Sequence, residues 1–175
     1  MSGNAPGLAL VGAVAAARLV ELAVSGRHAA WARTQGGVEH GRRHYAWMVT
    51  LHVAILTGSA VEPFFNGSRL DGLRFGAGLA ALAVANALRW WTIATLGRRW
   101  TTRVIVFPGW PLVAGGPFRY LRHPNYLAVA IEVAALPLAC GAWVTLVVGS
   151  VLNAVMMAVR IPCEERALGI RGGHA

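Results

Sequence analysis

The sequence predicts an all-α integral membrane protein with about five transmembrane helices. Of its 175 residues, 56% are hydrophobic and only 13% are charged, which is too apolar for an ordinary water-soluble domain of this length. The apolar residues fall into stretches of roughly 18 to 25 residues, the length that an α-helix needs to cross the hydrocarbon of a bilayer. No internal repeat or low-complexity tract divides them, so residues 1–175 are expected to form a single domain.

The first two spans are expected at residues 7–24 and 45–65. The first is rich in glycine and alanine, which suits close packing between membrane helices. No basic segment precedes it, so it is expected to remain as a helix and not to be removed as a signal peptide. Residues 27–43 form a polar, basic connector, and the second span is closed by Pro63 and the turn-forming residues 66–68.

The remaining spans are expected at residues 72–96 and within residues 126–159. The third span ends in a collar of tryptophan and arginine that is typical of the headgroup region. Residues 97–124, rich in arginine, glycine and proline, are too irregular to face lipid. Breaks near Pro137 and at Cys140-Gly141 indicate that the last apolar segment is two short spans joined as a tight helical hairpin.

Arginine placement predicts an orientation. All sixteen basic residues are arginine, and seven acids leave a net charge of +9. The turn after the second span holds only Arg69, with Arg74 just beyond it. The other loops and the tail hold Arg27, Arg33, Arg42, Arg43, Arg98, Arg99, Arg103, Arg119, Arg122, Arg160, Arg166 and Arg171. The positive-inside rule therefore places these segments in the cytoplasm and the N-terminus outside, and the charge indicates topology and phosphate contact, not nucleic-acid binding.

Two polar segments lie beside the last two spans. Residues 116–126, which we call the cassette, read Gly-Pro-Phe-Arg-Tyr-Leu-Arg-His-Pro-Asn-Tyr, and the last span ends in Arg160-Ile161-Pro162-Cys163-Glu164-Glu165. Arginines, a histidine, an asparagine, tyrosines and a carboxylate pair at the ends of membrane helices predict a functional site. Cys140 and Cys163 have neither CxxC nor histidine-rich spacing, so no disulfide framework or metal site is expected.

These segments resemble the isoprenylcysteine carboxyl methyltransferase superfamily of integral-membrane methyltransferases. Its signature is an Arg-His-Pro-x-Tyr segment, here residues 122–126, followed by a helical hairpin and a Glu-Glu pair. Within it the chain is most similar to the bacterial branch associated with type III polyketide synthases and with O-methylation of alkylpyrones and related phenolic lipids. The matching segments are Arg18-Leu19-Val20-Glu21-Leu22, Gly41-Arg42-Arg43-His44-Tyr45, Leu88-Arg89-Trp90-Trp91, Thr101-Thr102-Arg103-Val104-Ile105-Val106 and Arg160-Ile161-Pro162.

The resemblance implies S-adenosylmethionine as the methyl donor, bound without a Rossmann domain by the cassette loop and the end of the last helix. It implies a lipid-like acceptor and a functional link to a type III polyketide synthase. Arg160 matches a position that holds the acceptor. By position, the cofactor contacts would come from Arg103, Leu112, Val113, Phe118, His123, Asn125, Tyr126 and Glu164.

The chemistry of these side chains agrees with such roles. Glu164 can accept from an ammonium group or ribose hydroxyls, His123 and Asn125 supply directional hydrogen bonds, and Phe118 and Tyr126 offer aromatic faces to a cation. His123 could instead simply cap the helix that follows it.

Methyl transfer is an in-line displacement, so most of the catalysis should come from alignment and exclusion of water. Arg160 can hold the oxyanion of an enolic acceptor, whereas a simple phenol would gain more from a general base such as Glu165 or His123. Glu132, inside an apolar stretch, should face a cavity or a partner, so a substrate contact and an interhelical pair both stay open. Arg18 and Glu21 are expected to be a structural pair.

Other functions stay open. Carboxyl methylation of an isoprenylcysteine-like substrate and N-methylation of a phospholipid amine are neighbouring chemistries, although an amine would favour carboxylates over Arg160. A reductase would need a nicotinamide cofactor. A noncatalytic membrane scaffold or small transport subunit would tolerate alanine at His123 and Glu164 and would not bind the methyl donor.

Overall fold

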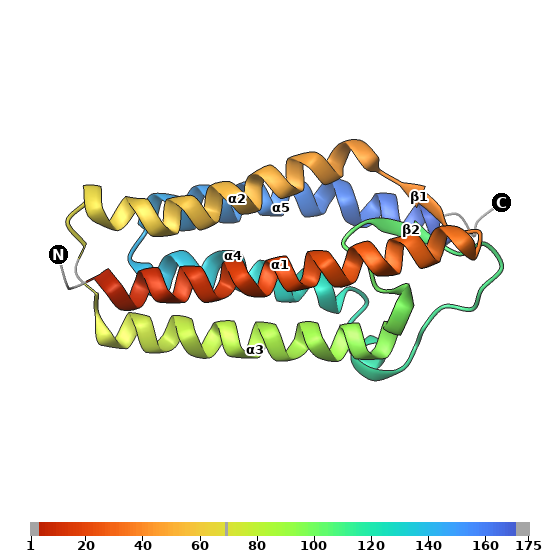
Figure 1. Cartoon of the computed structure of the whole chain (residues 1–175), viewed down its shortest axis with the longest axis horizontal. Helices are drawn as coiled ribbons and strands as arrows, with labels where there is room; N and C mark the ends of the chain where they lie inside the picture. Colours follow the sequence, from red (N-terminus) through yellow and green to blue (C-terminus); the bar gives the residue numbers. More distant parts are fainter. Residues whose placement is uncertain (1–3, 69, 171–175) are drawn as a thin grey trace.

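Five α-helices lie side by side and make up most of the part of the chain that the structure describes (Figure 1). The structure is a computed structural model and describes residues 4–68 and 70–170. In chain order the helices are α1 (Ala5–Thr34), α2 (Arg42–Phe65), α3 (Gly72–Leu96), α4 (Pro124–Cys140) and α5 (Trp143–Ala167). This architecture confirms the predicted all-α membrane fold.

Four of these helices, α1, α2, α3 and α5, are long and apolar enough to cross a membrane. With 17 residues, α4 is shorter, and its length of about 25 Å falls slightly below the hydrocarbon thickness. It packs against all four other helices and buries side chains such as Val133 and Leu136. Because protein covers α4 on several sides, this helix does not have to reach both lipid surfaces by itself.

The lipid-facing surface is apolar. On α5, for example, Val144, Val147, Val151 and Val155 recur at helical spacing and are all exposed. Such a stripe would be unfavourable in water, whereas hydrocarbon solvates it without cost. The exposed apolar residues therefore support a bilayer as the solvent of this bundle.

Some helices extend past the expected ends of their spans. α1 continues to Thr34 instead of ending at Val24, and α5 likewise passes its expected end to reach Ala167. Hydropathy marks where the apolar stretch stops, but a helix can continue into the headgroup region because its backbone hydrogen bonds stay satisfied. α3 has the expected bounds, and Asp71 caps it by accepting the Arg74 backbone N–H at 2.8 Å.

α4 and α5 form the tight hairpin that the sequence predicts. α4 continues through Pro137, and Gly141 follows it in a left-handed conformation (φ 74°) that favours glycine. Glu62 of α2 fixes the start of α5, because its carboxylate accepts the backbone N–H groups of Val144 and Thr145 at 2.8 Å each.

A small antiparallel sheet adds to the helices. β1 (Val38–His40) pairs with β2 (Val104–Val106), with Glu39 opposite Ile105. Both segments are predicted as connector or loop, because three residues are too few to give a strand pattern. The sheet joins the segment after α1 to the loop that leads into the cassette.

The two ends of the bundle differ in structure (Figure 1). The start of α1, the turn after α2 and the α4–α5 turn lie at one end, whereas β1, β2 and the C-terminal ends of α1 and α5 lie at the other. The cassette, which begins with the short helix η3 (Gly116–Arg119) and runs into the first turn of α4, shares this second end. We call it the cassette end. Arg69 and Arg171, used in the orientation argument, lie outside the described residues.

Candidate active site

Side chains from the cassette and from the last turns of α5 meet at the cassette end. The Tyr126 hydroxyl donates to Glu164 Oε2 at 2.7 Å, and His123 Nε2 lies 3.1 Å from Glu165 Oε1. The His123 and Tyr126 rings are also in edge contact, with centroids 5.7 Å apart. The structure thus brings together residues that are 38 and 42 positions apart in the sequence.

Local sequence explains how the cassette presents these groups. His123 lies outside the helical region (φ −132°, ψ 64°), because the proline that follows disfavours a helical conformation, and Pro124 begins α4. The His123 side chain makes no capping hydrogen bond to α4, so the structure does not support the simple capping role. Earlier in the cassette, Gly116 has φ 56°, and a Cβ there would lie 2.2 Å from Thr95 Oγ1. Only glycine suits this position.

Arg160 lies beside this group, one turn before Glu164 on α5. The residue is 7% exposed, and its Nη2 donates to the Thr102 carbonyl oxygen at 3.0 Å. Its guanidinium also interacts with the Tyr126 hydroxyl. Arg160 Nε is buried and has no hydrogen-bond partner among the described residues. A buried guanidinium with an unused donor suits an anionic oxygen.

Arg103, an expected cofactor contact, is held by β1 and α2. Its Nη1 donates to Glu39 Oε1 at 2.6 Å, and its guanidinium carbon lies 4.3 Å from the centre of the Tyr45 ring. Burial acts to raise the pKa of Glu39, but the hydrogen bond and charge of Arg103, with the charges of Arg42 and Arg33, lower that pKa below its usual value. The structure therefore makes Arg103 part of the link between the sheet and α2.

The other expected cofactor contacts lie on the loop and the cassette. Leu112 is exposed, whereas Val113 and Phe118 are half-buried. The described hydrogen bonds and ring contacts do not link these three residues to the Tyr126–Glu164 pair. Asn125 differs, because its Oδ1 is buried and has no partner among the described residues. This orphan acceptor lies next to Tyr126 and is available to a donor.

The loop that carries Leu112 is docked on the end of α1. The Phe107 and Trp110 rings stack at 4.9 Å, and Trp31 of α1 contacts both. Arg99 Nη1 also donates to the Pro111 carbonyl oxygen at 2.7 Å. These contacts hold residues 107–111 near the cassette end.

Glu132 belongs to a group of four charged residues, two of them buried (Glu21, Arg89) and two half-buried (Arg18, Glu132), which we call the ion cluster. Arg18 and Glu21 come from α1, Arg89 from α3 and Glu132 from α4. Arg18 Nη2 lies 3.1 Å from Glu132 Oε1, and Arg89 Nη1 lies 3.4 Å from Glu21 Oε2. Arg18 also pairs with Glu21, as expected, and Arg89 with Glu132. Two positive and two negative charges balance, and both Glu132 oxygens already have an arginine partner.

Sequence reasoning missed Ser25, Tyr45 and Glu39 as contributors to the site. Ser25 and Tyr45 contact Thr102, whose carbonyl holds Arg160, and Glu39 holds Arg103. The sequence does contain a pattern that could have identified Ser25, because Ser25 follows Arg18 by two helical turns and so lies on the same face of α1. Since the first span is expected to end at Val24, Ser25 falls just outside that span and is not counted on this helix face. A carboxylate in a loop, such as Glu39, gives no comparable signal.

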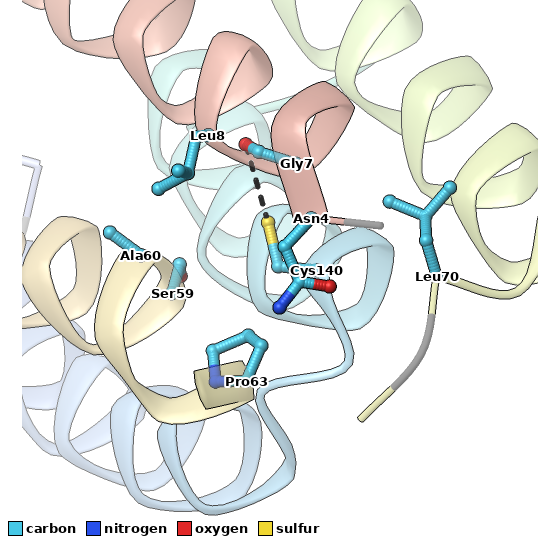
Figure 2. A pocket seen from close by; sticks show the side chains of 8 residues that line it. All are labelled: Asn4, Gly7, Leu8, Ser59, Ala60, Pro63, Leu70 and Cys140. Carbon is cyan, nitrogen blue, oxygen red and sulfur yellow. Dashed lines mark hydrogen bonds between the residues drawn. The ribbon is translucent and has the colours of Figure 1, made fainter. Parts of the chain in front are cut away.

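No described part of the chain gathers three His, Cys, Asp or Glu side chains as metal ligands would be. Cys140 and Cys163 are free thiols. A small cavity of about 10 Å³, roughly the space of one water molecule, lies at the end of the bundle opposite the cassette (Figure 2). It is too small for a cofactor. Its lining residues are Asn4, Gly7, Leu8, Ser59, Ala60, Pro63, Leu70 and Cys140.

Comparisons with known proteins agree with this arrangement. A sequence model of the isoprenylcysteine carboxyl methyltransferase (ICMT) family matches residues 78–170, which span most of α3, the cassette, α4 and α5. The uncharacterised protein YpbQ of Bacillus subtilis (strain 168) is 33% identical over 151 residues, covering 86% of this chain and 89% of YpbQ. An uncharacterised protein of Haemophilus influenzae is 31% identical over 160 residues, covering 89% and 90% of the two chains.

The matched family segment contains the cassette, the hairpin and the Glu-Glu pair, whose side chains meet in the structure. The helices that carry these groups are those of a membrane bundle. The chain therefore belongs to the isoprenylcysteine carboxyl methyltransferase (ICMT) family of membrane methyltransferases.

Proposed function

We propose that this protein transfers a methyl group from S-adenosylmethionine to an oxygen of an amphiphilic lipid such as an alkylpyrone or alkylresorcinol. The observation that carries the proposal is that the Tyr126–Glu164 and His123–Glu165 pairs form at one end of a membrane bundle, with Arg160 beside Tyr126 and one turn before Glu164 on α5. Family membership supports methyl transfer, and the resemblance to the polyketide-associated branch supports the acceptor class.

The residues at the cassette end suit S-adenosylmethionine in charge and in hydrogen-bonding capacity. Glu164 supplies a carboxylate for the ammonium group or the ribose hydroxyls, and the orphan Asn125 Oδ1 supplies a second acceptor. The faces of Phe118 and Tyr126 suit a cationic sulfonium. When bound, the cofactor supplies a methyl group whose carbon–sulfur bond breaks, with the electron pair staying on sulfur, as the acceptor oxygen forms the new bond to carbon.

Arg160 suits an acceptor that carries negative charge on oxygen. Its unused Nε–H and its burial allow a charge-assisted hydrogen bond to an enolate or phenolate, which orients the oxygen toward the methyl group. A cationic side chain at this position disfavours an amine acceptor, so phospholipid N-methylation is the weaker alternative. Carboxyl methylation of an isoprenylcysteine-like substrate also uses an anionic oxygen, and Arg160 supports it equally.

The His123–Glu165 pair can remove the acceptor proton. With the Nε2–H of His123 donated to the Glu165 carboxylate at 3.1 Å, Nδ1 carries the lone pair that accepts a proton. The carboxylate then stabilises the imidazolium that forms. An acidic enol reaches the site already ionised and depends on this pair less than a phenol does.

The bundle supplies a route for the acceptor tail. Apolar side chains cover the lipid-facing surface of α5, and the candidate active site lies at the end of the same helix. We place the cassette end in the cytoplasm, because the arginines are concentrated in the loops and tail that meet there. The tail would then stay in the bilayer while the ring reaches a cofactor that enters from the cytoplasm.

Methyl transfer from labelled S-adenosylmethionine by detergent-solubilised protein tests the proposal. Alkylpyrones, alkylresorcinols, prenylcysteine analogues and phosphatidylethanolamine are offered in parallel. Label in the pyrone or resorcinol, lost in Glu164→Gln and kept in the control Arg166→Gln, is the expected result. Arg166 is exposed at the same end of α5, so it controls for a change of charge there.

Other outcomes separate the alternatives. Label in the prenylcysteine analogue or the phosphatidylethanolamine would replace the acceptor and keep the methyltransferase. A protein that neither binds S-adenosylmethionine nor changes with Glu164→Gln would be a noncatalytic membrane component, and the proposal would fail.

A further inference from the structure

We propose that Ser25 of α1 is a positioning residue for the acceptor, because it fixes residue Thr102, whose carbonyl orients Arg160. Ser25 does not touch the acceptor and acts only through Thr102. This inference rests on the proposed function, since it assumes that Arg160 holds the acceptor oxygen.

The hydroxyl of Ser25 forms two hydrogen bonds with Thr102. The Thr102 backbone N–H donates to Ser25 Oγ at 2.9 Å, and the two side-chain oxygens are also 2.9 Å apart. The Thr102 hydroxyl donates to the Tyr45 hydroxyl oxygen at 3.4 Å. Because the single Thr102 hydroxyl proton is used in that bond, the Ser25 hydroxyl must be the donor in its bond to Thr102 Oγ1. Ser25 is 3% exposed, so water does not replace these bonds easily.

The same residue also contacts Arg160, through the carbonyl of its following peptide group. The Thr102 carbonyl oxygen accepts from Arg160 Nη2 at 3.0 Å. A guanidinium is planar, so fixing one of its nitrogens restricts the direction of the others. The Thr102 bond therefore sets the direction of the unused Nε–H of Arg160 and the position of its charge beside Tyr126.

Other contacts hold the loop in place without Ser25. His28, one turn further along α1, lies with Nδ1 2.8 Å from the Trp100 carbonyl oxygen. The β1–β2 pairing and the Arg103–Glu39 hydrogen bond hold the residues that follow Thr102. Loss of the Ser25 hydroxyl should therefore leave the loop attached while the backbone dihedral angles of Thr102, and with them its carbonyl, become free to change. The effect should appear in acceptor use and not in cofactor binding.

The test compares Ser25→Ala with Ser59→Ala, using labelled S-adenosylmethionine and the acceptor that the wild type uses. Ser59 is also a buried serine, 1% exposed, but its hydroxyl has no partner among the described residues and it lies at the other end of the bundle. We expect Ser25→Ala to lower kcat/KM for the acceptor about tenfold, mainly through KM, with the Kd of the cofactor within about twofold of wild type. Ser59→Ala should match the wild type in both.

A double-mutant cycle with Arg160→Lys tests whether Ser25 acts through Arg160. Lysine lacks the planar guanidinium, so Ser25→Ala should lower kcat/KM by less than about twofold in that background. An undiminished tenfold loss there would overturn the proposal. So would unchanged acceptor kinetics in Ser25→Ala, or equal losses of cofactor and acceptor binding, which would assign Ser25 to the fold.

Failure of the proposed function would look different. A wild-type protein that transfers no methyl group to any acceptor removes the proposed function, and the role of Ser25 falls with it. Wild-type transfer that Arg160→Lys impairs and Ser25→Ala does not impair removes only the role of Ser25.

Discussion

At the scale of single residues, the two adjacent glutamates at the end of α5 have different partners. Successive residues of an α-helix point about 100° apart, so neighbouring side chains reach different groups. Glu164 accepts from Tyr126, whereas Glu165 lies against His123. The two carboxylates therefore have different surroundings, which fits the separate roles proposed for them in cofactor binding and proton transfer.

Glutamine at each position should separate these roles. Glu164→Gln removes the charge proposed for the ammonium group or ribose, so cofactor binding should weaken at least about tenfold. Glu165→Gln should leave cofactor binding nearly unchanged and lower kcat for a phenolic acceptor by about 10²-fold, because imidazolium loses its stabilising charge. Isothermal titration with S-adenosylmethionine and steady-state kinetics measure the two effects. Equal losses in both variants would show that the roles are not divided.

The lowered pKa of Glu39 predicts how the stability of the folded protein changes at acidic pH. Its pKa is lower in the folded than in the unfolded state, because the hydrogen bond and charge of Arg103 outweigh burial. The stabilisation from Glu39 is then fully present above the unfolded pKa and is lost as the pH falls through the folded pKa. The thermal midpoint in detergent should fall between about pH 5 and pH 3 in the wild type, and less steeply in Glu39→Gln. Parallel curves for the two proteins would contradict this.

At the scale of helices, α3 and α4 approach closely because of one glycine. A Cβ on Gly78 would lie 2.6 Å from Ala139 Cβ and 2.8 Å from the Ala135 carbonyl oxygen. Small residues on both sides allow the backbones to meet, as is common in membrane bundles. Gly76, half a turn earlier on α3, has open space around it.

Alanine at these two glycines should act in opposite directions. Gly78→Ala must push α3 and α4 apart and should lower the free energy of unfolding by about 1–3 kcal/mol. Gly76→Ala should leave it unchanged or raise it by up to about 1 kcal/mol, because alanine is the better helix former. Denaturant titration of both variants in the same detergent checks the difference. A destabilisation shared by both would contradict the packing argument, because only Gly78 lacks room for a Cβ.

The helices also show what the sequence predicts well. Their number, order and the α4–α5 hairpin follow from the lengths of apolar stretches and from turn residues, and α3 matches because Asp71 caps its start. The C-terminal ends of α1 and α5 cannot be predicted in this way, because hydropathy does not indicate how far a helix continues beyond the hydrocarbon region. The pairing of Glu164 with Tyr126 and of Glu165 with His123 depends on how α5 is rotated against α4, which one sequence does not encode in a local pattern.

At the scale of the whole molecule, the ion cluster links three helices in the middle of the bundle. It has no net charge, and its side chains are 16% exposed or less. Removal of one charge leaves its partner buried without compensation, which usually costs more than the pair contributes. Helix association in this protein therefore depends on a matched set of charges.

A double-mutant cycle should reveal this coupling. Arg89→Gln and Glu132→Gln alone should each lower the free energy of unfolding by about 3–5 kcal/mol. The double variant should lose less than the sum by about 1–3 kcal/mol. Unfolding titrations in detergent give all three values, and additive losses would contradict the coupling.

Methyl transfer by the same variants decides the role of Glu132. If Glu132→Gln raises the acceptor KM and the comparably destabilised Arg89→Gln does not, Glu132 contacts the substrate, as the sequence allows. If both variants change the acceptor KM equally, the role of Glu132 is structural.

The ion cluster also constrains how the protein is made. Glu21 precedes its partner Arg89 by 68 residues in the chain, so α1 is synthesised and enters the membrane before α3 exists. Each charge at the centre of a lone helix costs roughly 2.5–3.5 kcal/mol to insert. Until α3 and α4 arrive, the pair within α1 between Arg18 and Glu21 is what offsets that cost. The cluster therefore favours late assembly, in which α1 stays near the insertion machinery until its counter-charges are translated.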